Sequence, residues 1–244
     1  MKTMIVTGSS QGIGLAIAKK FLEINYQVIT ISRTKIFEIL SKKHSHYSGD
    51  LSNWTDCLNI CDDIKQKFTN IDVLVNNVGK SQWSSLENVT EDFVDELFDT
   101  NVKSYIAITK GILPLMQRGS TIINMSSMAA KRGTKNNSIY CASKFAINGL
   151  TQSWAKELGP KGIRVNAICP VLVESEGLYA ALVMNDAPAQ ETGVKAFMEE
   201  FKKSQTALGY LPLANDVADF CATIINNRTL TGQCINLDSG VFPQ

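Results

Sequence analysis

The chain has almost no net charge and no long apolar run. Its 24 Lys and Arg residues nearly balance 23 Asp and Glu residues, leaving a formal charge of +1 over 244 residues. This balance gives no electrostatic reason to expect nucleic acid or an anionic membrane surface as a partner. No apolar stretch approaches the roughly 18 residues that span a bilayer, and the N-terminal apolar run ends at Gly8, too early for a signal peptide. We therefore expect a cytoplasmic protein with no nucleic-acid or membrane partner.

Residue types that bind metals are also scarce. The two histidines, His44 and His46, fall in a polar stretch that we interpret as a solvated loop. The six cysteines include no C-x-x-C pair, and Cys57 and Cys61 have no second pair to complete a zinc site. We expect reduced, mostly buried cysteines and no metal site.

Apolar runs of strand length alternate with segments of helical periodicity. The predicted strands cover residues 3–7, 27–32, 45–49, 71–75, 121–125, 163–169 and 233–237. Helices are predicted after the glycine-rich stretch 8–14, from a cap at Ser52 or Asn53 to about residue 68, over 91–116, over 138–158, and from Asn215 or Asp216 onward. Such alternation predicts an α/β fold with a doubly wound parallel sheet. No linker or repeat divides the chain, so we expect a single domain over 1–244, with a less regular excursion at 171–209.

A glycine-rich turn joins the first strand to its helix. Gly8, Gly12 and Gly14 give the spacing G-x-x-x-G-x-G. Between a strand and a helix, such a turn lets backbone amides and the helix N-terminus approach a phosphate. The alternative is a plain tight turn between strand and helix.

Arg33 follows the second strand, at the position where nucleotide folds often carry an acidic residue for the ribose hydroxyls of NAD. An arginine flanked by Ser32 and Thr34 suits the 2′-phosphate of NADP instead. The pattern favours NADP(H) over NAD(H), and the alternative is an ordinary solvated arginine.

Distinctive residues recur directly after the predicted strands: Gly8, Arg33, Asp50, Asn76, Ser127 and Pro170. Ligands of open α/β sheets bind at the carboxyl edge of the strands. The recurrence therefore predicts a ligand at this edge.

Tyr140 and Lys144 are four residues apart in a predicted helix and so share one face. An ammonium near a phenol favours the phenolate and lowers the tyrosine pKa from about 10. The pair predicts a proton donor and acceptor that works near neutral pH. The alternative is a surface helix that carries these residues by chance.

Taken together, these motifs make the sequence resemble the short-chain dehydrogenase/reductase family over essentially its whole length. T-G-x-x-x-G-I-G fits residues 7–14, N-N-x-G fits 76–79, and Tyr140-x-x-x-Lys144 fits the family's active-site pair. Asn101 and Ser127 stand at the positions of the catalytic asparagine and serine, and residues 165–170 and 231–233 also match. Val171, Ser239 and Tyr210 depart from the family pattern, and none of them removes a catalytic group.

The resemblance implies a Rossmann fold and a hydride transfer between NADP(H) and a carbonyl or secondary alcohol. Tyr140 is then the general acid or base, and Ser127 binds and polarises the substrate oxygen. Lys144 holds the nicotinamide ribose and lowers the pKa of Tyr140, and Asn101 interrupts its helix and holds a proton-relaying water. Cofactor contacts are further implied for Gly8, Ser10, Gln11 and Ile13 (pyrophosphate), Asp50 and Leu51 (adenine), Asn76 (adenosine ribose) and Val173 (carboxamide). By themselves, Ser127 could cap a turn and Asn101 could be an exposed helix residue.

Residues 171–209 are expected to choose the substrate, either as an amphipathic lid or as a plain cover for the sheet. One candidate is a 3-oxoacyl-acyl-carrier-protein reductase, with Lys131 and Arg132 meeting the acidic carrier. Alternatives are a reductase of small ketones, diketones or sugars, and a protein that senses NADP without catalysis. The resemblance also implies a homo-oligomer, a tetramer or a dimer, built through the long helices around Asn101 and Tyr140.

Overall fold

A computed structural model of the chain describes residues 1–34, 39 and 41–243. The strands form one parallel sheet in the order β3-β2-β1-β4-β5-β6-β7. Their bounds are β1 Thr3–Thr7, β2 Gln27–Ser32, β3 His44–Ser48, β4 Val73–Asn76, β5 Thr121–Met125, β6 Arg164–Pro170 and β7 Cys234–Leu237. The strand order reverses between β1 and β4, so the predicted doubly wound parallel sheet is confirmed.

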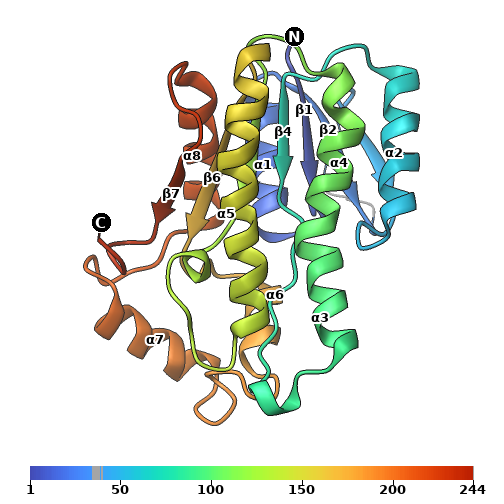
Figure 1. Cartoon of the computed structure of the whole chain (residues 1–244). Coiled ribbons are helices and arrows are strands. Elements are labelled where there is room, and N and C mark those ends of the chain that lie inside the picture. Colours follow the sequence, from blue (N-terminus) through green and yellow to red (C-terminus); the bar gives the residue numbers. More distant parts are fainter. Residues whose placement is uncertain (35–38, 40, 244) are drawn as a thin grey trace.

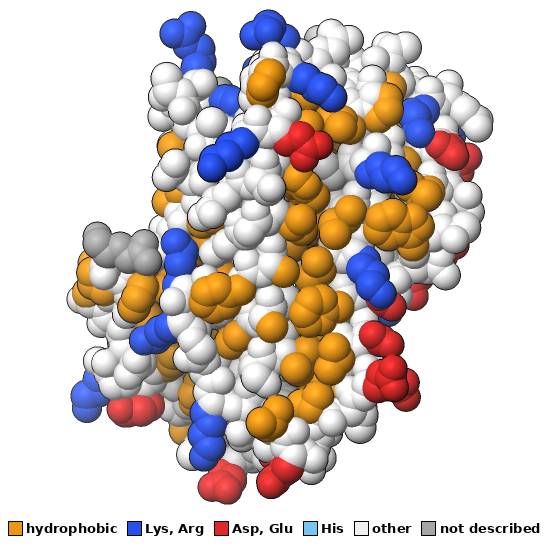
Figure 2. Space-filling view, viewed as in Figure 1, with side chains coloured by type: hydrophobic (Ala, Val, Ile, Leu, Met, Phe, Trp, Pro, Cys, Tyr) orange, Lys and Arg blue, Asp and Glu red, His pale blue; other side chains and the backbone are white. Residues whose placement is uncertain are grey.

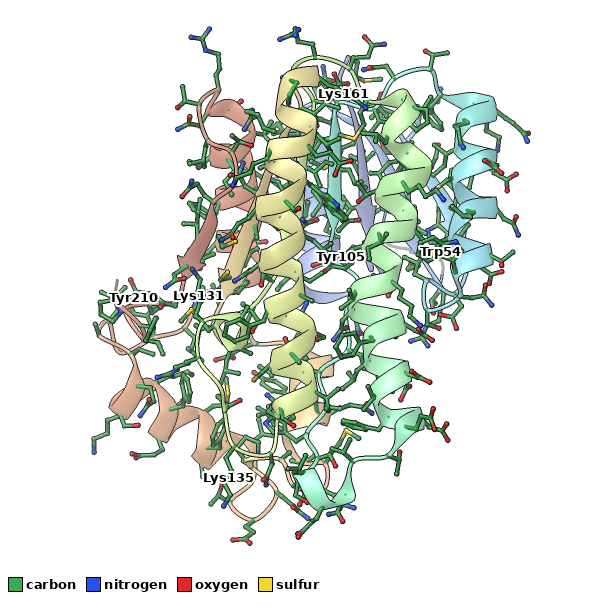
Figure 3. All side chains as sticks on the ribbon, viewed as in Figure 1. Trp54, Tyr105, Lys131, Lys135, Lys161 and Tyr210 are labelled. Carbon is green, nitrogen blue, oxygen red and sulfur yellow. The ribbon has the colours of Figure 1, made fainter. Side chains whose placement is uncertain are left out.

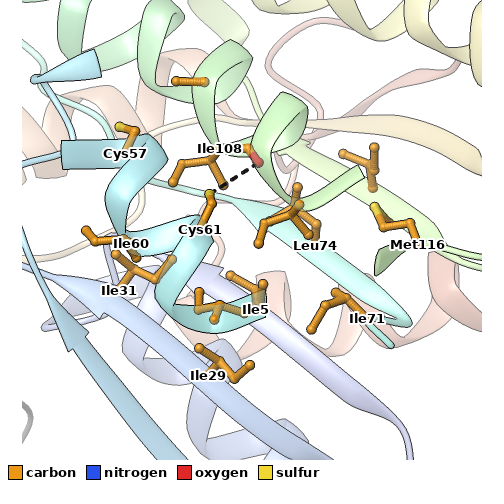
Figure 4. Packing of buried hydrophobic residues seen from close by; sticks show 14 of the residues in the cluster. Ile5, Ile29, Ile31, Cys57, Ile60, Cys61, Ile71, Leu74, Ile108 and Met116 are labelled. Carbon is orange, nitrogen blue, oxygen red and sulfur yellow. Dashed lines mark hydrogen bonds between the residues drawn. The ribbon is translucent and has the colours of Figure 1, made fainter. Parts of the chain in front are cut away.

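Helices cover both faces of the sheet (Figure 1). The long helices are α1 Gly12–Glu23, α2 Trp54–Lys67, α4 Ser104–Ile112, α5 Ser138–Leu158 and α8 Ala214–Asn226. On one face, α2, α4 and α5 pack on a core that includes Ile5 and Ile29 (Figure 4). On the other, α1 and α8 pack on Met4 and Val28. Because successive side chains of a strand point to opposite faces, the short apolar strands can supply two cores at once.

Two predicted helix starts can be compared with the observed caps. Asn53 caps α2, because its side chain accepts the backbone N–H of Asp56 at 3.0 Å. Helix α8 begins at Ala214, slightly earlier than predicted. Asp216 lies within its first turn, where the carboxylate accepts the N–H of Leu213 at 2.7 Å.

The predicted helix over 91–116 is interrupted at Asn101, as the resemblance implied. It divides into α3 Glu91–Phe98, a π-helical segment Asp99–Lys103, and α4, followed by a 3₁₀ turn Leu113–Leu115. Within the π-helical segment the N–H of Ser104 bonds to the carbonyl of Asp99, five residues earlier. Such local widening occurs frequently at functional sites. Other 3₁₀ turns cover Leu86–Asn88, Met128–Ala130 and Gly159–Lys161.

The interpretation of His44 and His46 as solvated loop residues is wrong. Both lie in the edge strand β3 and contact the buried Thr30 hydroxyl, at 2.7 Å from His44 Nε2 and 3.0 Å from His46 Nδ1. The strand was predicted over 45–49, but the polar sequence hid the contacts of the two histidines, because they bind a hydroxyl rather than apolar side chains. The cysteines are free, and all except the half-buried Cys234 are buried.

Residues 171–209, called the lid segment below, contain α6 Glu176–Leu182 and α7 Val194–Gln205. The strand arrows of Figure 1 point toward these two helices, so the lid segment lies at the carboxyl edge of the sheet. Leu182, Ala189 and Met198 form a third apolar cluster with Leu211, separate from the two cores on the sheet. The lid segment therefore has an apolar core of its own, and its role toward a substrate stays a prediction.

Ser239, which departs from the family pattern, has an unfavourable backbone conformation. Ser239 adopts φ 53°, a left-handed conformation that favours glycine. Its carbonyl accepts the N–H groups of Ala207 and Leu208, which ties the C-terminal segment to the end of the lid segment. No helix in the described part of the chain has the length and apolarity to cross a bilayer.

Candidate active site

A cavity of about 1080 Å³ opens at the carboxyl edge of the sheet. It is lined by most of the residues that the sequence predicted: Gly8, Ser10, Gln11, Ile13, Arg33, Asp50, Leu51, Ser127, Tyr140, Lys144 and Val173. Asn76 and Asn101 are not among its lining residues. The cavity therefore joins the predicted cofactor contacts to the predicted catalytic group in one space.

The glycine turn is packed backbone to backbone. Gly8 has φ +63°, and a Cβ added there would lie 2.6 Å from the Cα of Val78. A Cβ on Gly14 would lie 2.4 Å from the carbonyl oxygen of Gly8. Only glycine fits at either position, so the turn brings the start of α1 directly against the segment that follows β4.

The N-terminus of α1 faces this cavity without a side-chain cap. Gln11 occupies the cap position and makes no capping hydrogen bond, and the first turn carries no acidic residue. Uncapped N–H groups at a helix start suit a phosphate group. The residues present thus fit the pyrophosphate of a dinucleotide.

Arg33 and Asp50 lie at one end of the cavity, after β2 and β3. The backbone N–H and hydroxyl of Ser52 donate to Asp50 Oδ1 at 3.0 and 2.9 Å. These bonds, with a smaller contribution from the charge of Arg33, lower the pKa of Asp50. Arg33 itself is exposed, while Leu51 is buried beside it. A cation, a carboxylate and an apolar side chain thus lie together where we expect the adenosine end of a dinucleotide cofactor.

The structure does not bring the Asn76 side chain to the cavity. Asn76 is fully buried, and its amide donates to Thr109 Oγ1 at 3.0 Å and to Asn124 Oδ1 at 2.9 Å. The residue belongs to β4, so its side chain points into the helix layer rather than past the strand end. Its neighbour Asn77 lines the cavity and donates to the carbonyls of Thr7 and Gly8, both at 3.0 Å. The cavity is therefore lined by Asn77 and not by the Asn76 side chain, and a ribose contact of Asn76 stays a prediction.

Lys144 is buried beneath the cavity, with 4% of its surface exposed. Its ammonium donates to the carbonyl of Met125 at 2.9 Å and lies 5.8 Å from the ring centroid of Tyr140. Burial lowers the pKa of Lys144 to about 8. The hydroxyl of Tyr105 donates to the same Met125 carbonyl at 3.1 Å, so the end of β5 anchors both groups.

The pKa of Tyr140 does not move in the predicted direction. Burial raises this pKa, and hydrogen bonds with the side chains of Ser127 and Ser81 oppose the rise. Lys144 does not lower it here, because its ammonium is bound to the Met125 carbonyl rather than to the phenol. The expected lowering by Lys144 is wrong for this arrangement, and the serine hydroxyls take that role.

Ser127 caps a turn, as one interpretation of its position predicted, and it also lines the cavity. Its Oγ accepts the N–H of Ala129 at 3.1 Å and so caps the short 3₁₀ turn. It also lowers the pKa of Tyr140 against the effect of burial, while its contact with a substrate stays a prediction.

Asn101 is fully buried, so it is not the exposed helix residue of the alternative interpretation. Its Oδ1 accepts the backbone N–H of Lys80 at 2.7 Å, and its Nδ2 donates to the Lys80 carbonyl at 2.9 Å. The same Nδ2 donates to Ser143 Oγ at 3.1 Å. Asn101 thus ties the segment after β4 to α5, and the bound water stays a prediction.

Sequence reasoning missed several residues of the cavity. Ser81, Gln82 and Trp83 line it soon after the N-N-x-G motif, and Lys135 lines it between Ser127 and Tyr140. Arg132, which was predicted only as a cation for an acidic carrier, also lines the cavity. Figure 3 places Lys135 at the lid end of the molecule, below the carboxyl edge of the sheet. Their positions after strand ends were the available signal, since that edge carries the site. The apolar lid residues of the cavity include Leu178, Leu182, Phe197 and Phe201.

The parallel sheet, the glycine turn and the Tyr140–Lys144 group define a nucleotide-binding oxidoreductase site, and comparison with known proteins agrees. The family model of the short chain dehydrogenase matches residues 2–182. Diacetyl reductase [(S)-acetoin forming] of Staphylococcus aureus is 30% identical, and the match covers 98% of this chain and 97% of that protein. L-2,3-butanediol dehydrogenase of Corynebacterium glutamicum is 31% identical over 99% of this chain and 98% of that protein.

A solved structure of a short chain dehydrogenase from Burkholderia cenocepacia in complex with NADP superposes with a TM-score of 0.85. It is 28% identical, covering 98% of this chain and 97% of that chain. The chain therefore belongs to the short-chain dehydrogenase family. It is an oxidoreductase that acts on CH–OH or C=O groups of a small molecule with a nicotinamide cofactor.

Proposed function

We propose that this enzyme reduces small ketones or vicinal diketones with NADPH, or oxidises the corresponding alcohols with NADP⁺, with residues 1–244 acting as one domain. The relatives named for diacetyl and butanediol support this substrate class. The observation that carries the proposal is the cavity itself, which joins the serine–tyrosine–lysine group to an apolar lid. An apolar wall with a few convergent polar groups suits a small carbonyl compound.

The residues of the site supply proton handling and orientation. Tyr140 donates its phenolic proton to the carbonyl oxygen in reduction and accepts a proton from the alcohol in oxidation. Ser127 donates a hydrogen bond to the same oxygen and stabilises the charge that develops there. The nicotinamide, when bound, supplies or accepts the hydride. Lys144 holds the ribose beside Tyr140, and the α1 N-terminus with Ser10, Gln11 and Ile13 holds the pyrophosphate.

The expectation of an acyl-carrier-protein substrate receives less support. Lys131 was one of the two cations proposed to meet the carrier, but its ammonium donates to the carbonyl of Cys234 at 2.8 Å. Figure 3 shows Lys131 beside the strands β6 and β7. A lysine that binds the start of β7 is a poor docking cation, and we give this substrate second place.

The substrate class is tested by following NADPH oxidation with butane-2,3-dione, acetoin, a monoketone, an aldohexose and an acetoacetyl thioester. We expect the highest kcat/KM with the vicinal carbonyl compounds. A higher value for the thioester would favour the carrier-linked substrate. Tight NADPH binding without turnover of any compound would favour a protein that senses NADP.

For the cofactor, we propose that Arg33 binds the 2′-phosphate and makes NADP(H) the preferred form. Charge-assisted hydrogen bonds contribute about 1.5–3 kcal/mol, so Arg33→Ala is expected to raise the KM for NADPH by about 10–100-fold and leave that for NADH unchanged. Lys43→Ala is a matched control, because that lysine pairs with Asn25 and does not line the cavity. An unchanged KM for NADPH in Arg33→Ala would rule out the phosphate role.

We also propose a homo-oligomer, most simply a tetramer. Figure 2 shows apolar side chains along the face formed by α4 and α5. Phe145 on α5 is 49% exposed there, directly after Lys144. Large exposed apolar patches mark interaction surfaces, and light scattering on the purified protein measures the assembly mass.

A further inference from the structure

Asn137 is a polar residue of the cavity that the proposed mechanism does not use. It lines the cavity together with Ser127 and Tyr140, and only 5% of its surface is exposed. Its Nδ2 donates to Thr134 Oγ1 at 3.2 Å. Its Oδ1 is buried and finds no hydrogen-bond donor among the residues that the structure describes. A buried carbonyl oxygen without a donor is costly, so we expect a donor from outside the chain.

Helix capping does not explain this asparagine. Asn137 occupies the cap position of α5, where an asparagine oxygen usually accepts an N–H group of the first turn. Here the side chain makes no capping bond, and the backbone carbonyl of Asn137 accepts the N–H of Cys141 at 2.9 Å. The Thr134 hydroxyl accepts from Asn137 Nδ2 and lies 3.6 Å from the sulfur of Cys141, which is its second partner. The Asn137 oxygen is therefore left for a group that enters the cavity.

The backbone around Asn137 is fixed on both sides. The Asn136 carbonyl accepts the N–H of Ser84 at 2.8 Å, and Asn136 Nδ2 donates to the carbonyl of Asp186 in the lid segment at 3.2 Å. In the other direction α5 runs without interruption to Tyr140, three residues further along. The terminal amide of an asparagine turns easily about its last torsion, so the Asn137 oxygen can meet a ligand while the backbone stays in place.

A second amide oxygen of the cavity also lacks a donor. Gln82 lines the cavity from the segment that follows β4, and its Oε1 is buried with no hydrogen-bond partner in the described part of the chain. Both oxygens accept hydrogen bonds, and neither can donate one. A vicinal diketone offers only acceptors and leaves both oxygens without a partner. A hydroxyl group beside the carbonyl supplies the missing donor.

We propose that the site recognises an α-hydroxy ketone, and that Asn137 Oδ1 accepts a hydrogen bond from its hydroxyl group while Ser127 and Tyr140 bind its carbonyl oxygen. The inference rests on the proposed function, and it makes Asn137 a specificity-determining residue. In reduction the carbonyl carbon accepts the hydride of NADPH and the carbonyl oxygen accepts the proton of Tyr140, which gives a vicinal diol. The hydroxyl at Asn137 keeps its own proton and takes no part in the transfer.

The test compares acetoin, which has a hydroxyl beside its carbonyl, with butane-2,3-dione, which has a second carbonyl there. Asn137→Leu keeps the branched shape of the side chain and removes both hydrogen-bonding atoms. At saturating NADPH, we expect it to lower kcat/KM for acetoin about tenfold and to leave that for butane-2,3-dione within about twofold. Asn137→Asp keeps an acceptor oxygen and is expected to retain the activity with acetoin. Ser138→Ala is the matched control, because Ser138 is exposed and lies outside the cavity lining.

The possible outcomes separate this inference from the proposed function. No turnover of any carbonyl compound by the unmodified enzyme would remove the proposed function itself. With an active enzyme, an equal loss of both substrates in Asn137→Leu, or no loss of either, would overturn the role of Asn137, because a structural role or a bound water would then explain the residue. A loss of acetoin in Asn137→Asp as large as in Asn137→Leu would also overturn it, because the amide NH₂ and not the oxygen would then face the substrate. Unchanged NADPH affinity shows that a variant is folded, and if Asn137→Leu does not fold, Asn137→Ala takes its place with the same expected and contradicting results.

Discussion

The glycine turn and the lid segment face each other across one cavity but are built in opposite ways. At the turn, backbone packs on backbone: Gly8 lies against Val78, and Asn77 binds the carbonyls of Thr7 and Gly8. In the lid segment, side chains pack on side chains, as in the cluster around Leu182 and Met198. Backbone packing leaves almost no freedom for substitution, whereas an apolar cluster tolerates exchange. The turn suits a cofactor of constant shape, and the lid segment suits a substrate that differs between relatives.

The two parts also meet directly. A Cβ on Gly12 would lie 3.6 Å from the Cβ of Ser175, which caps α6. A Cβ on Gly177 would lie 3.4 Å from the end of the Gln11 side chain. These are ordinary van der Waals contacts, so the lid segment rests on the turn without locking it.

The largest expected effect comes from Lys144, which serves the catalytic group at a cost in stability. Lys144→Met should lower kcat/KM by about 10³-fold, because it removes the ammonium that we propose holds the nicotinamide ribose in position beside Tyr140. The same change should stabilise the folded protein at pH 7 by on the order of 2 kcal/mol, because it removes a buried charge. The Met125 carbonyl keeps its bond from Tyr105. Steady-state kinetics and denaturant unfolding measure the two effects.

The sign of the pH dependence follows from the depressed pKa of Lys144. This pKa is about 8 in the folded protein against 10.5 unfolded, so the unfolded chain binds more protons between these values. The free energy of unfolding of the unmodified enzyme therefore rises with pH between these two pKa values. The extra stability of the Lys144→Met variant should vanish above about pH 10.5. A constant advantage at every pH would show that the stabilisation has another cause.

Replacing a glycine by alanine should change the free energy of unfolding in opposite directions in the glycine turn and in the lid segment. Gly8→Ala places a Cβ against backbone at a positive φ, and we expect a loss of about 3 kcal/mol in unfolding free energy together with weaker NADPH binding. Gly177 lies within α6, and an added Cβ there would meet only the end of the Gln11 side chain. For Gly177→Ala we therefore expect the gain in helix propensity, up to about 1 kcal/mol, to raise the free energy of unfolding. Thermal unfolding with and without NADPH compares them. Equal losses of unfolding free energy in both variants would contradict the difference in packing between the glycine turn and the lid segment.

A smaller effect is expected within the lid cluster. Met198 is 4% exposed, and Met198→Ala should loosen the cluster and raise the KM for the carbonyl substrate by about tenfold, which corresponds to about 1.4 kcal/mol. The KM for NADPH should stay the same. Lys203→Ala on the same helix is the exposed control. A parallel rise in both KM values would mean that the lid segment also organises the cofactor end.

Most of the fold was predictable, because buried parallel strands are apolar runs whose periodicity differs from that of helices. β3 was predicted one residue late, and the contacts of His44 and His46 with Thr30 were missed because they are polar. Tyr140, Lys144, Ser127 and the glycine turn were found from their spacing. The spacing could not show that the Asn76 side chain points into the core while Asn77 lines the cavity, because neighbouring strand residues point to opposite faces. Ser81, Gln82 and Trp83 were missed because only the tertiary fold brings the segment after β4 to the cavity.

The central claim, that Tyr140 exchanges the proton in a nicotinamide-dependent carbonyl reaction, is tested most directly by Tyr140→Phe. NADPH oxidation with butane-2,3-dione is measured for this variant and the unmodified enzyme, with NADPH affinity measured on both. We predict equal NADPH affinity and a fall in kcat of about 10³-fold or more. A variant that reduces the diketone within a few-fold of the unmodified rate would contradict the claim.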